Sequence, residues 1–249
     1  MTDVTSWLAA LEQRHLANLT RSELTRALRA LSSLYVERRE KIASGAPLDS
    51  AGKRAAFALF YGPLHFFTIK AIVRAIDAKA PHTIHDLGCG TGVGGAAWAL
   101  HSHGTPAIAG IDRNGWAVAE ANRTYADLGL RGRAKTGDLT RFPHFQIPTF
   151  PNDAILLAYA VNELTEAQRE ALLPKVVQAT TRGARLLIVE PIARRDRPWW
   201  PGWVEALGTA GARHDEWRFQ ADLPPLLRQI AKSAGLDPRE LTARTIHSV

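Results

Sequence analysis

The stretch Ile84-His85-Asp86-Leu87-Gly88-Cys89-Gly90-Thr91-Gly92 carries the strongest indication of fold in this 249-residue chain. An apolar run stands directly before three glycines that alternate with other residues. Because glycine lacks Cβ, it adopts positive φ easily and lets backbone N–H groups approach a ligand at the start of a helix. We therefore expect a strand over residues 83–87, a ligand-binding turn after it, and a helix over residues 94–101.

Beyond this turn, short apolar or β-branched runs alternate with helical patterns. The expected strands cover residues 107–111, 133–136, 153–159, 184–190 and 241–249, and the expected helices cover residues 115–128, 166–180 and 223–233. Alternation at this rhythm predicts right-handed βαβ units, and hence an α/β fold with a doubly wound, mostly parallel, Rossmann-like sheet. Ligands of such sheets bind at the carboxyl ends of the strands.

The first third of the chain has a different pattern. Apolar residues recur there at three- and four-residue spacing over residues 4–16, 23–44 and 50–78, which is typical of helices. We therefore expect two regions. Residues 1–80 form an N-terminal helical cap that helps to bind substrate, and residues 81–249 form a cofactor-binding α/β domain.

The glycine turn is compatible with more than one cofactor. Residues 90–95 satisfy the dinucleotide fingerprint G-x-G-x-x-G, and Asp112 follows Gly92 by 20 residues, as the acid that binds the ribose of NAD would. Two features argue against NAD. Asp86 stands two residues before the first glycine, and helices precede the first strand, whereas a dinucleotide domain normally starts near the N-terminus of its chain.

The pattern Asp86-x-Gly88-x-Gly90-x-Gly92 closely resembles the cofactor turn of class I S-adenosylmethionine-dependent methyltransferases. The resemblance continues with Asp112 at the end of the second expected strand and with residues 137–139 after the third. It implies a methyltransferase whose cofactor, S-adenosylmethionine, is bound by Asp86, Gly88, Gly90, Gly92, Asp112, Asp138 and Leu139.

Each acidic residue has its own part in this assignment. By this resemblance, Asp86 would help to place the ammonium group of the cofactor, and Gly88 and Gly90 would let the backbone approach its methionine end. The resemblance also implies that Asp112 accepts hydrogen bonds from the ribose hydroxyls and that Asp138 binds the adenine amino group. Carboxylates accept such protons well and can do so in pairs.

The methyl acceptor is expected beyond the fourth strand, where Tyr159, Asn162 and Glu163 are the candidate catalytic residues. The chain has no N/D-P-P-Y/F motif, which marks many amino-group methyltransferases of DNA and protein. Its one cysteine, Cys89, lies in the cofactor turn, which argues against a cysteine nucleophile, a disulfide or a thiolate metal site. The remaining chemistry is in-line transfer to nitrogen, oxygen or sulfur without a metal, with a base only where the acceptor proton has a high pKa.

Three features have alternative interpretations. Glu163 could act on the acceptor or simply begin a helix. His65 could face the cofactor from the N-terminal helices or fill the core. The stretch Arg194–Trp203 could clamp phosphates and stack on bases, cover a small-molecule site, or pack its tryptophans on the core.

Positive charge is concentrated towards the two ends of the chain. Lys and Arg outnumber Asp and Glu by 12 to 7 over residues 1–80 and by 11 to 8 over residues 181–249, while residues 81–180 hold 8 basic and 9 acidic residues. Basic flanks favour a polyanionic partner such as RNA, or simply keep the protein soluble. Apolar runs such as residues 154–161 fall far short of the roughly 20 residues of a membrane span. With no secretory signal evident, we expect a soluble, cytoplasmic protein without a membrane partner.

Residues 34–39, 55–58, 158–164 and 187–191 add a second resemblance. Together with the glycine turn, they are similar to the methyltransferase-like family associated with the small ribosomal subunit, which implies a role at that subunit. The chain differs from this family in one important feature, the metal-binding cysteines. Where family members carry metal-binding cysteines after the fifth strand, this chain has residues 214–219, His-Asp-Glu-Trp-Arg-Phe, and a cluster cannot be built without thiolates.

The sequence therefore predicts an S-adenosylmethionine-dependent methyltransferase with a nitrogen, oxygen or sulfur acceptor, and ribosomal RNA is one candidate. Two alternatives stay open. One is a small-molecule methyltransferase in which the cap and the Trp-rich stretch enclose the substrate. The other is a ribosome-assembly factor without catalytic activity.

Overall fold

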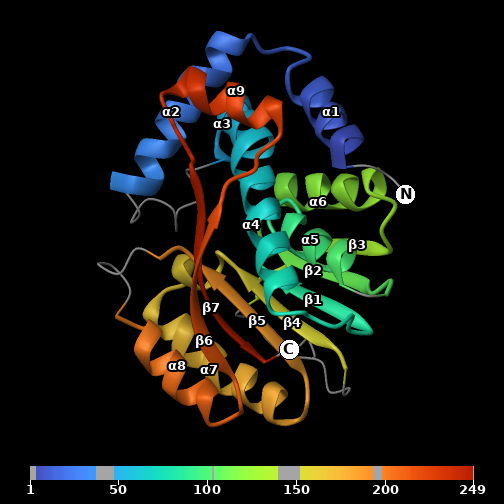
Figure 1. Ribbon diagram of the computed structural model, residues 1–249, viewed down its shortest axis with the longest axis vertical. Helices are drawn as coiled ribbons and strands as arrows, with labels where there is room; N and C mark the ends of the chain where they lie inside the picture. Colours follow the sequence, from blue (N-terminus) through green and yellow to red (C-terminus); the bar gives the residue numbers. More distant parts are fainter. Residues whose placement is uncertain (1–3, 38–47, 103, 140–151, 193–197, 249) are drawn as a thin grey trace.

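The computed structural model describes residues 4–37, 48–102, 104–139, 152–192 and 198–248. A seven-stranded sheet in the order β3-β2-β1-β4-β5-β7-β6 runs through the molecule (Figure 1). Its strands are β1 (Thr83–Leu87), β2 (Ala107–Asp112), β3 (Gly132–Thr136), β4 (Ala154–Ala158), β5 (Arg185–Glu190), β6 (Arg213–Gln220) and β7 (Glu240–Ser248). The helices are α1 (Val4–His15), α2 (Arg21–Glu37), α3 (Ala51–Ala56), the π-helix η3 (Phe57–Tyr61), α4 (Gly62–Ala75), α5 (Val93–His101), α6 (Gly115–Asp127), the short η4 (Val161–Glu163), α7 (Glu166–Thr181), α8 (Trp200–Gly208) and α9 (Pro225–Ala234).

Strand pairing makes the first five strands parallel. β1 lies between β2 and β4, β2 pairs with β3, and β4 pairs with β5. β7 runs antiparallel between β5 and β6. The predicted doubly wound, mostly parallel sheet is therefore confirmed. The strand order reverses between β1 and β4, and in such sheets ligands bind beside the carboxyl ends of the strands at that reversal.

Alternation along the central strands divides the core between the two faces of the sheet. Leu156 and Leu187 belong to a buried cluster with side chains of α4, α5 and α6. Leu157 and Leu186, one residue away, belong to a second cluster with side chains of α7 and α8. Figure 1 shows these two groups of helices on opposite sides of the sheet.

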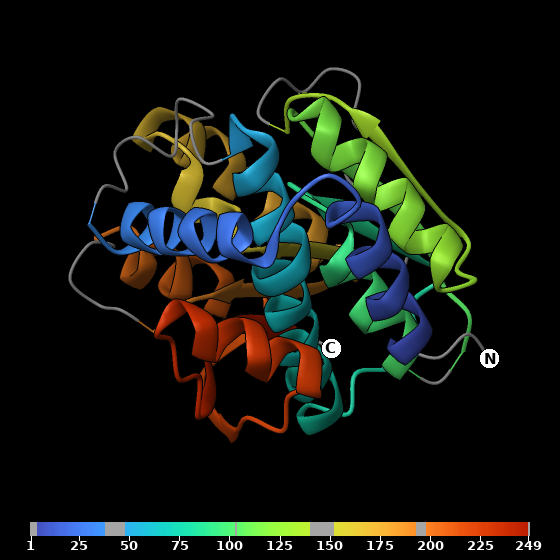
Figure 2. The same cartoon turned by 90° about the horizontal axis from the view of Figure 1, so that it is seen from above.

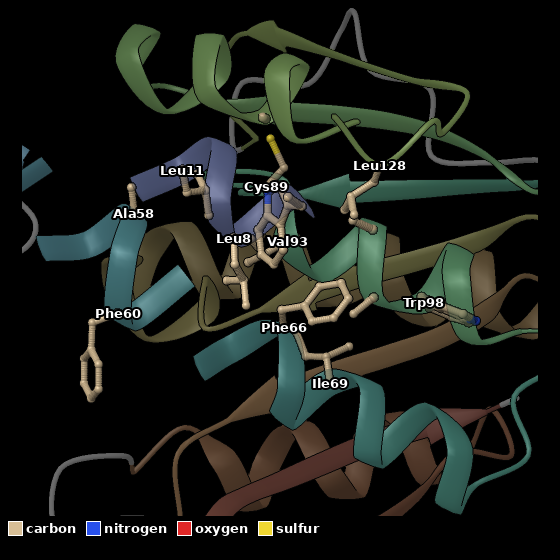
Figure 3. Close-up of a cluster of buried hydrophobic side chains, with 14 of the residues drawn as sticks. Leu8, Leu11, Ala58, Phe60, Phe66, Ile69, Cys89, Val93, Trp98 and Leu128 are labelled. Carbon is tan, nitrogen blue, oxygen red and sulfur yellow. The ribbon is translucent and has the colours of Figure 1, made fainter. Parts of the chain in front are cut away.

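The N-terminal helices belong to the first cluster. Figure 3 shows Leu8 and Leu11 of α1 beside Val93 at the start of α5. Seen from above, α1, α2 and α9 lie around the rod formed by α3, η3 and α4 (Figure 2). Residues 1–80 therefore share their core with the α/β region, and their division from residues 81–249 as a separate cap stays a prediction.

A buried carboxylate fastens α1 to the α/β region. Glu120 of α6 is 0% exposed, and its Oε1 lies 2.7 Å from Nη2 of Arg14 and 3.2 Å from Nε2 of His15. Arg123 approaches Oε2 at 3.3 Å. Because an unpaired buried carboxylate is strongly destabilising, these contacts hold the end of α1 in place.

The rod Ala51–Ala75 is long and apolar enough to cross a membrane, by length and composition alone. This corrects the expectation that every apolar segment falls far short of a membrane span. In the structure, 61% of its most apolar window is buried inside the protein, and α4 packs along α5. The core position of the rod explains its hydrophobic character.

Three elements, β6, α8 and the short η4, were not predicted from the sequence. β6 has Trp217 and Phe219 as its only large apolar residues, and charged residues between them hide the strand pattern. α8 begins with Trp200-Pro201-Gly202, which resembles a loop, although proline is tolerated in the first turn of a helix. The predicted helix over residues 23–44 corresponds to α2, and residues 38–44 lie outside the described part of the chain.

Candidate functional site

The glycine turn after β1 is hydrogen-bonded to the end of β2. Gly88 and Cys89 donate their N–H groups to the carbonyl oxygen of Ile111 at 2.9 and 3.0 Å. Gly90 donates to Oδ2 of Asp112 at 2.9 Å. Gly88 and Gly90 have φ of +75° and +51°, a region that glycine adopts at little cost. The local backbone therefore requires glycine at both positions.

Gly88 and Gly90 differ in the space that an added Cβ atom would find. A Cβ on Gly88 would stand 2.8 Å from Cβ of Ala160 and 3.4 Å from Cδ2 of Leu139, so the segments after β1, β3 and β4 meet at Gly88. Among the described residues, no atom lies within 4 Å of a Cβ built on Gly90. The backbone at Gly90 thus borders open space, as expected where a ligand approaches the turn.

Asp112 ends β2 and is half-buried. Its Oδ1 accepts from the backbone N of Asn114 at 2.8 Å, and its Oδ2 accepts from Gly90. An ionised carboxylate offers about four acceptor positions, so about two remain for hydroxyl groups of a ligand. This arrangement fits the predicted contact with the ribose of S-adenosylmethionine. Asp138 is exposed in the segment after β3, next to Leu139, and its contact with adenine stays a prediction.

Asp86 and Gly92 have partners within the protein. Asp86 is 1% exposed, and its Oδ2 accepts from the backbone N of Gly95 in α5 at 2.9 Å. Burial raises the pKa of Asp86 to about 7, against the hydrogen bond from Gly95 and with a further contribution from the charge of Asp112. A Cβ on Gly92 would stand 2.8 Å from the ring of Tyr125. Asp86 therefore secures the start of α5, Gly92 permits close helix packing, and their cofactor contacts stay predictions.

The chain leaves β4 through Tyr159, which has φ of +58°. Few residues other than glycine adopt this left-handed conformation. The backbone N of Tyr159 donates to the carbonyl oxygen of Val189 at 2.8 Å. Its ring stacks on His65 of α4, with centroids 3.9 Å apart and planes inclined by 18°. The structure thus brings His65, from the N-terminal helices, against a predicted catalytic residue.

Asn162 is held on both sides of its carboxamide. Its Nδ2 donates to Oε2 of Glu190, and its backbone N donates to Oε1 of the same residue at 3.2 Å. Its Oδ1 accepts from Nε1 of Trp199 at 3.2 Å. Glu190 ends β5 and is 0% exposed. Asn162 therefore connects the segments after β4 and β5, and its predicted catalytic part stays a prediction.

Glu163 ends η4 with an exposed side chain. Its pKa is raised to about 7, mainly because neighbouring protein atoms reduce its hydration; the charge of Asp112 adds to the shift, and Arg113 opposes it. Thr165 caps the following helix, so Glu163 is not needed to begin α7. A carboxylate whose pKa is raised towards neutral is suited to accept a proton near neutral pH.

The tryptophans of the stretch 194–203 pack on the core. Trp200 and Trp203 are buried in the cluster formed with α7 and α8, and the ring of Trp199 lies 5.4 and 5.3 Å from theirs. This favours core packing for the aromatic half of the stretch. Residues 194, 195 and 197, its arginines, lie outside the described part of the chain.

The residues that stand in place of the family's cysteines, 214–219, lie in β6. On β6, Arg218 donates to Glu240 of β7 at 3.2 Å. Over the described residues, no three His, Cys, Asp or Glu side chains are grouped so that they could hold a metal ion.

Residues 84–183 match a family model described as a methyltransferase domain. Over these 100 of its 249 residues, the chain is therefore similar to methyltransferase domains. The matched segment begins in β1 and ends after α7, so it includes the glycine turn, Asp112 and Glu163. A comparison with curated proteins gives no match.

Several solved structures have the same fold. The mitomycin 7-O-methyltransferase MmcR is 15% identical with a TM-score of 0.54, and the match covers 97% of this chain and 71% of that one. A putative O-methyltransferase from Nostoc punctiforme is 14% identical with a TM-score of 0.54, covering 89% and 72%. NcsB1, an O-methyltransferase from neocarzinostatin biosynthesis solved with S-adenosylmethionine and 2-hydroxy-5-methyl naphthoic acid, is 15% identical with a TM-score of 0.51, covering 96% and 74%.

The solved structures confirm the predicted Rossmann-like fold. The family match agrees with the prediction of a methyltransferase, and S-adenosylmethionine stays the predicted cofactor. The comparisons do not confirm the more specific resemblance to the family associated with the small ribosomal subunit. The matched model is described only as a methyltransferase domain.

Proposed function

We propose that the protein transfers the methyl group of S-adenosylmethionine to a hydroxyl oxygen of a small molecule, and that Glu163 accepts the hydroxyl proton. The observation that carries this proposal is the accessible carboxylate of Glu163, close enough to Asp112 for the two charges to interact. A hydroxyl group is a weak nucleophile until a base removes its proton. With a pKa of about 7, Glu163 can act as that base near neutral pH.

Different residues of the chain would bind the cofactor and accept the proton. When bound, S-adenosylmethionine supplies an electrophilic methyl group. Asp112 would bind the ribose hydroxyls through its remaining acceptor positions, with the backbone of Gly90 beside the ligand. Asn162, fixed by Glu190 and Trp199, keeps η4 and therefore Glu163 in position. Methyl transfer depends mainly on such positioning of the reacting atoms.

Two considerations support oxygen and a small molecule. MmcR and NcsB1 are O-methyltransferases, which agrees with a proton-accepting side chain near the acceptor. Among the described residues, the partly exposed rings of Phe57, Tyr61 and His65 lie beside Tyr159 and offer apolar surface. Ribosomal RNA is the competing acceptor, and it rests on the basic flanks of the sequence.

The first experiment is a calorimetric titration with S-adenosylmethionine and, separately, with NAD. Labelled methyl transfer is then measured into total RNA and into a small-molecule extract. We expect binding of S-adenosylmethionine alone and label in the small-molecule fraction. Label confined to RNA would replace the proposal with the RNA acceptor, and binding of NAD alone would contradict the assignment of the glycine turn.

A further inference from the structure

Four aromatic side chains, Phe57, Tyr61, His65 and Tyr159, contact one another beside the carboxyl end of β4; they are called the aromatic cluster below. The ring of His65 lies 6.3 Å from those of Phe57 and Tyr61 and 3.9 Å from that of Tyr159, between centroids. All four side chains are partly exposed, whereas residues 58–60 between them in sequence are buried. The cluster therefore presents ring surface that the core does not cover.

A π-helix brings the helical members of the cluster together. Residues eight apart in a straight α-helix are separated by about 12 Å along its axis. The rings of Phe57 and His65 nevertheless lie 6.3 Å apart, with η3 between them. A π turn has poorer hydrogen-bond geometry than an α turn, and such turns occur frequently at functional sites. Its presence here is a second indication that this ring surface has a binding role.

The hydroxyl groups of the cluster are hydrogen-bonded within the protein. Tyr159 bonds to Thr68, and Tyr61 bonds to Ser32. The hydroxyl of Thr68 also donates to the carbonyl oxygen of Leu64 at 2.9 Å. A ligand on the cluster would therefore meet ring faces and edges rather than free hydroxyl donors.

The rings are also neutral near pH 7. Burial lowers the pKa of His65 to about 4, and burial raises the pKa of Tyr61 and of Tyr159. Neutral ring surface is unfavourable in water, and a flat apolar partner covers it well because aromatic rings attract one another in stacked and edge-to-face arrangements. This chemistry selects a planar ring over a sugar, a phosphate or a flexible aliphatic chain.

We propose that the aromatic cluster binds the methyl acceptor, and that this acceptor is a planar aromatic alcohol. The inference rests on the proposed function, because Tyr159 and Glu163 belong to the same short segment after β4. In the reaction the phenolic O–H bond breaks and its proton passes to the carboxylate of Glu163. An oxygen–carbon bond forms as the methyl–sulfur bond breaks, and the sulfur keeps the electron pair of that bond.

The test compares two probes that differ in aromaticity, 2-naphthol and decahydro-2-naphthol. Their affinities are measured by calorimetry on the full chain in the presence of S-adenosylhomocysteine. We expect 2-naphthol to bind at least tenfold more tightly. His65→Leu should weaken 2-naphthol binding at least tenfold and remove the preference, and His65→Phe should restore it. Phe219→Leu, which changes a half-buried ring stacked on Trp217 of β6 outside the cluster, is the matched control and should leave both affinities unchanged.

Equal affinity of the wild-type protein for both probes would overturn the proposal. So would an unchanged preference in His65→Leu, with thermal unfolding used to verify that the variant is folded. Labelled methyl transfer to each probe separates this inference from the proposed function. Transfer to the saturated alcohol alone would overturn the aromatic site and leave hydroxyl methylation standing. Ring-dependent binding in a protein that fails to bind S-adenosylmethionine would overturn the proposed function and leave the aromatic site standing.

Discussion

Gly90 donates its backbone N–H to Oδ2 of Asp112 at 2.9 Å, so one carboxylate both ends β2 and holds the glycine turn after β1. Oδ1 of Asp112 accepts from Asn114, the residue that caps α6. Backbone support and the predicted ribose contact therefore depend on the same side chain. A substitution at Asp112 changes both, and the two effects can be separated by choosing the replacement.

Asp112→Ala should lower the affinity for S-adenosylmethionine at least 100-fold while the protein stays folded. Hydrogen bonds to a charged group contribute about 1.5–3 kcal/mol each, and two would be lost. Asp112→Asn keeps an acceptor for the turn and should have a smaller effect. Calorimetry measures the affinity, and Asp237→Ala, at an exposed carboxylate paired with Arg239, is the control. Unchanged affinity in Asp112→Ala would refute the site assignment.

Glu163→Gln should reduce kcat about 10²- to 10⁴-fold, the usual contribution of a general base, with little change in cofactor affinity. The base is active when ionised, so the wild-type rate should rise with pH around pH 7, following the raised pKa of Glu163. The variant should lose this rise. A pH–rate profile with labelled cofactor makes the comparison, and Glu166→Gln in the first turn of α7 should behave as wild type. An unaltered profile in Glu163→Gln would exclude it as the base.

Asn162→Leu should destabilise the fold by about 1–3 kcal/mol, because the buried carboxylate of Glu190 loses the Nδ2 donor and Nε1 of Trp199 loses its acceptor, while the backbone donor of residue 162 remains. It should also lower kcat more than it raises KM, since η4 no longer holds Glu163. Urea unfolding and steady-state kinetics measure the two effects. Adding Glu190→Gln should recover part of the stability because the buried group is then neutral. A variant as stable and active as wild type would contradict the positioning role.

Glu120→Ala should cost roughly 3 kcal/mol of stability at pH 7, because it removes the buried partner of Arg14 and His15. Burial tends to raise the pKa of Glu120, but His15 and Arg14 outweigh this and lower it to about 2. The stabilisation is therefore present above the ordinary glutamate pKa and is lost as pH falls towards 2. Urea unfolding across this pH range and hydrogen exchange in α1 test it. Glu12→Gln, which breaks an exposed pair with Arg21, should change stability by less than about 1 kcal/mol.

Asp86 should affect the pH dependence of stability with the opposite sign to Glu120, because its pKa is raised rather than lowered. Asp86→Asn tests this. Burial raises the pKa of Asp86 to about 7, so the folded protein retains a proton that the unfolded chain releases near pH 4. Wild-type stability should therefore decline between about pH 4 and 7 from this group, and the neutral variant should lack that part of the decline. The difference in unfolding free energy between pH 4 and pH 8 is the measurement. An identical difference in both proteins would show that Asp86 is ionised throughout.

Much of the fold was readable from local sequence. The apolar run of residues 83–87, the three alternating glycines and the strand–helix alternation are short-range patterns, and they reflect backbone geometry and burial that repeat every two or 3.6 residues. They predicted the mostly parallel sheet and the alternation of strands and helices along the chain. β6 was missed because it is an edge strand whose charged residues face solvent, so burial left only Trp217 and Phe219 as its pattern.

Side-chain partners far apart in the chain were decided by the tertiary structure. The sequence by itself determined the methyltransferase turn, Asp112 at a strand end and a candidate Glu163. Only the folded chain brought His65 onto Tyr159, Asn162 onto Glu190 and Glu120 onto Arg14. The physical reason is that a turn or strand depends on neighbouring residues, whereas a buried contact depends on how whole helices and strands pack. The proposed acceptor site also depends on packing, because it combines a helix of the N-terminal region with the segment after β4.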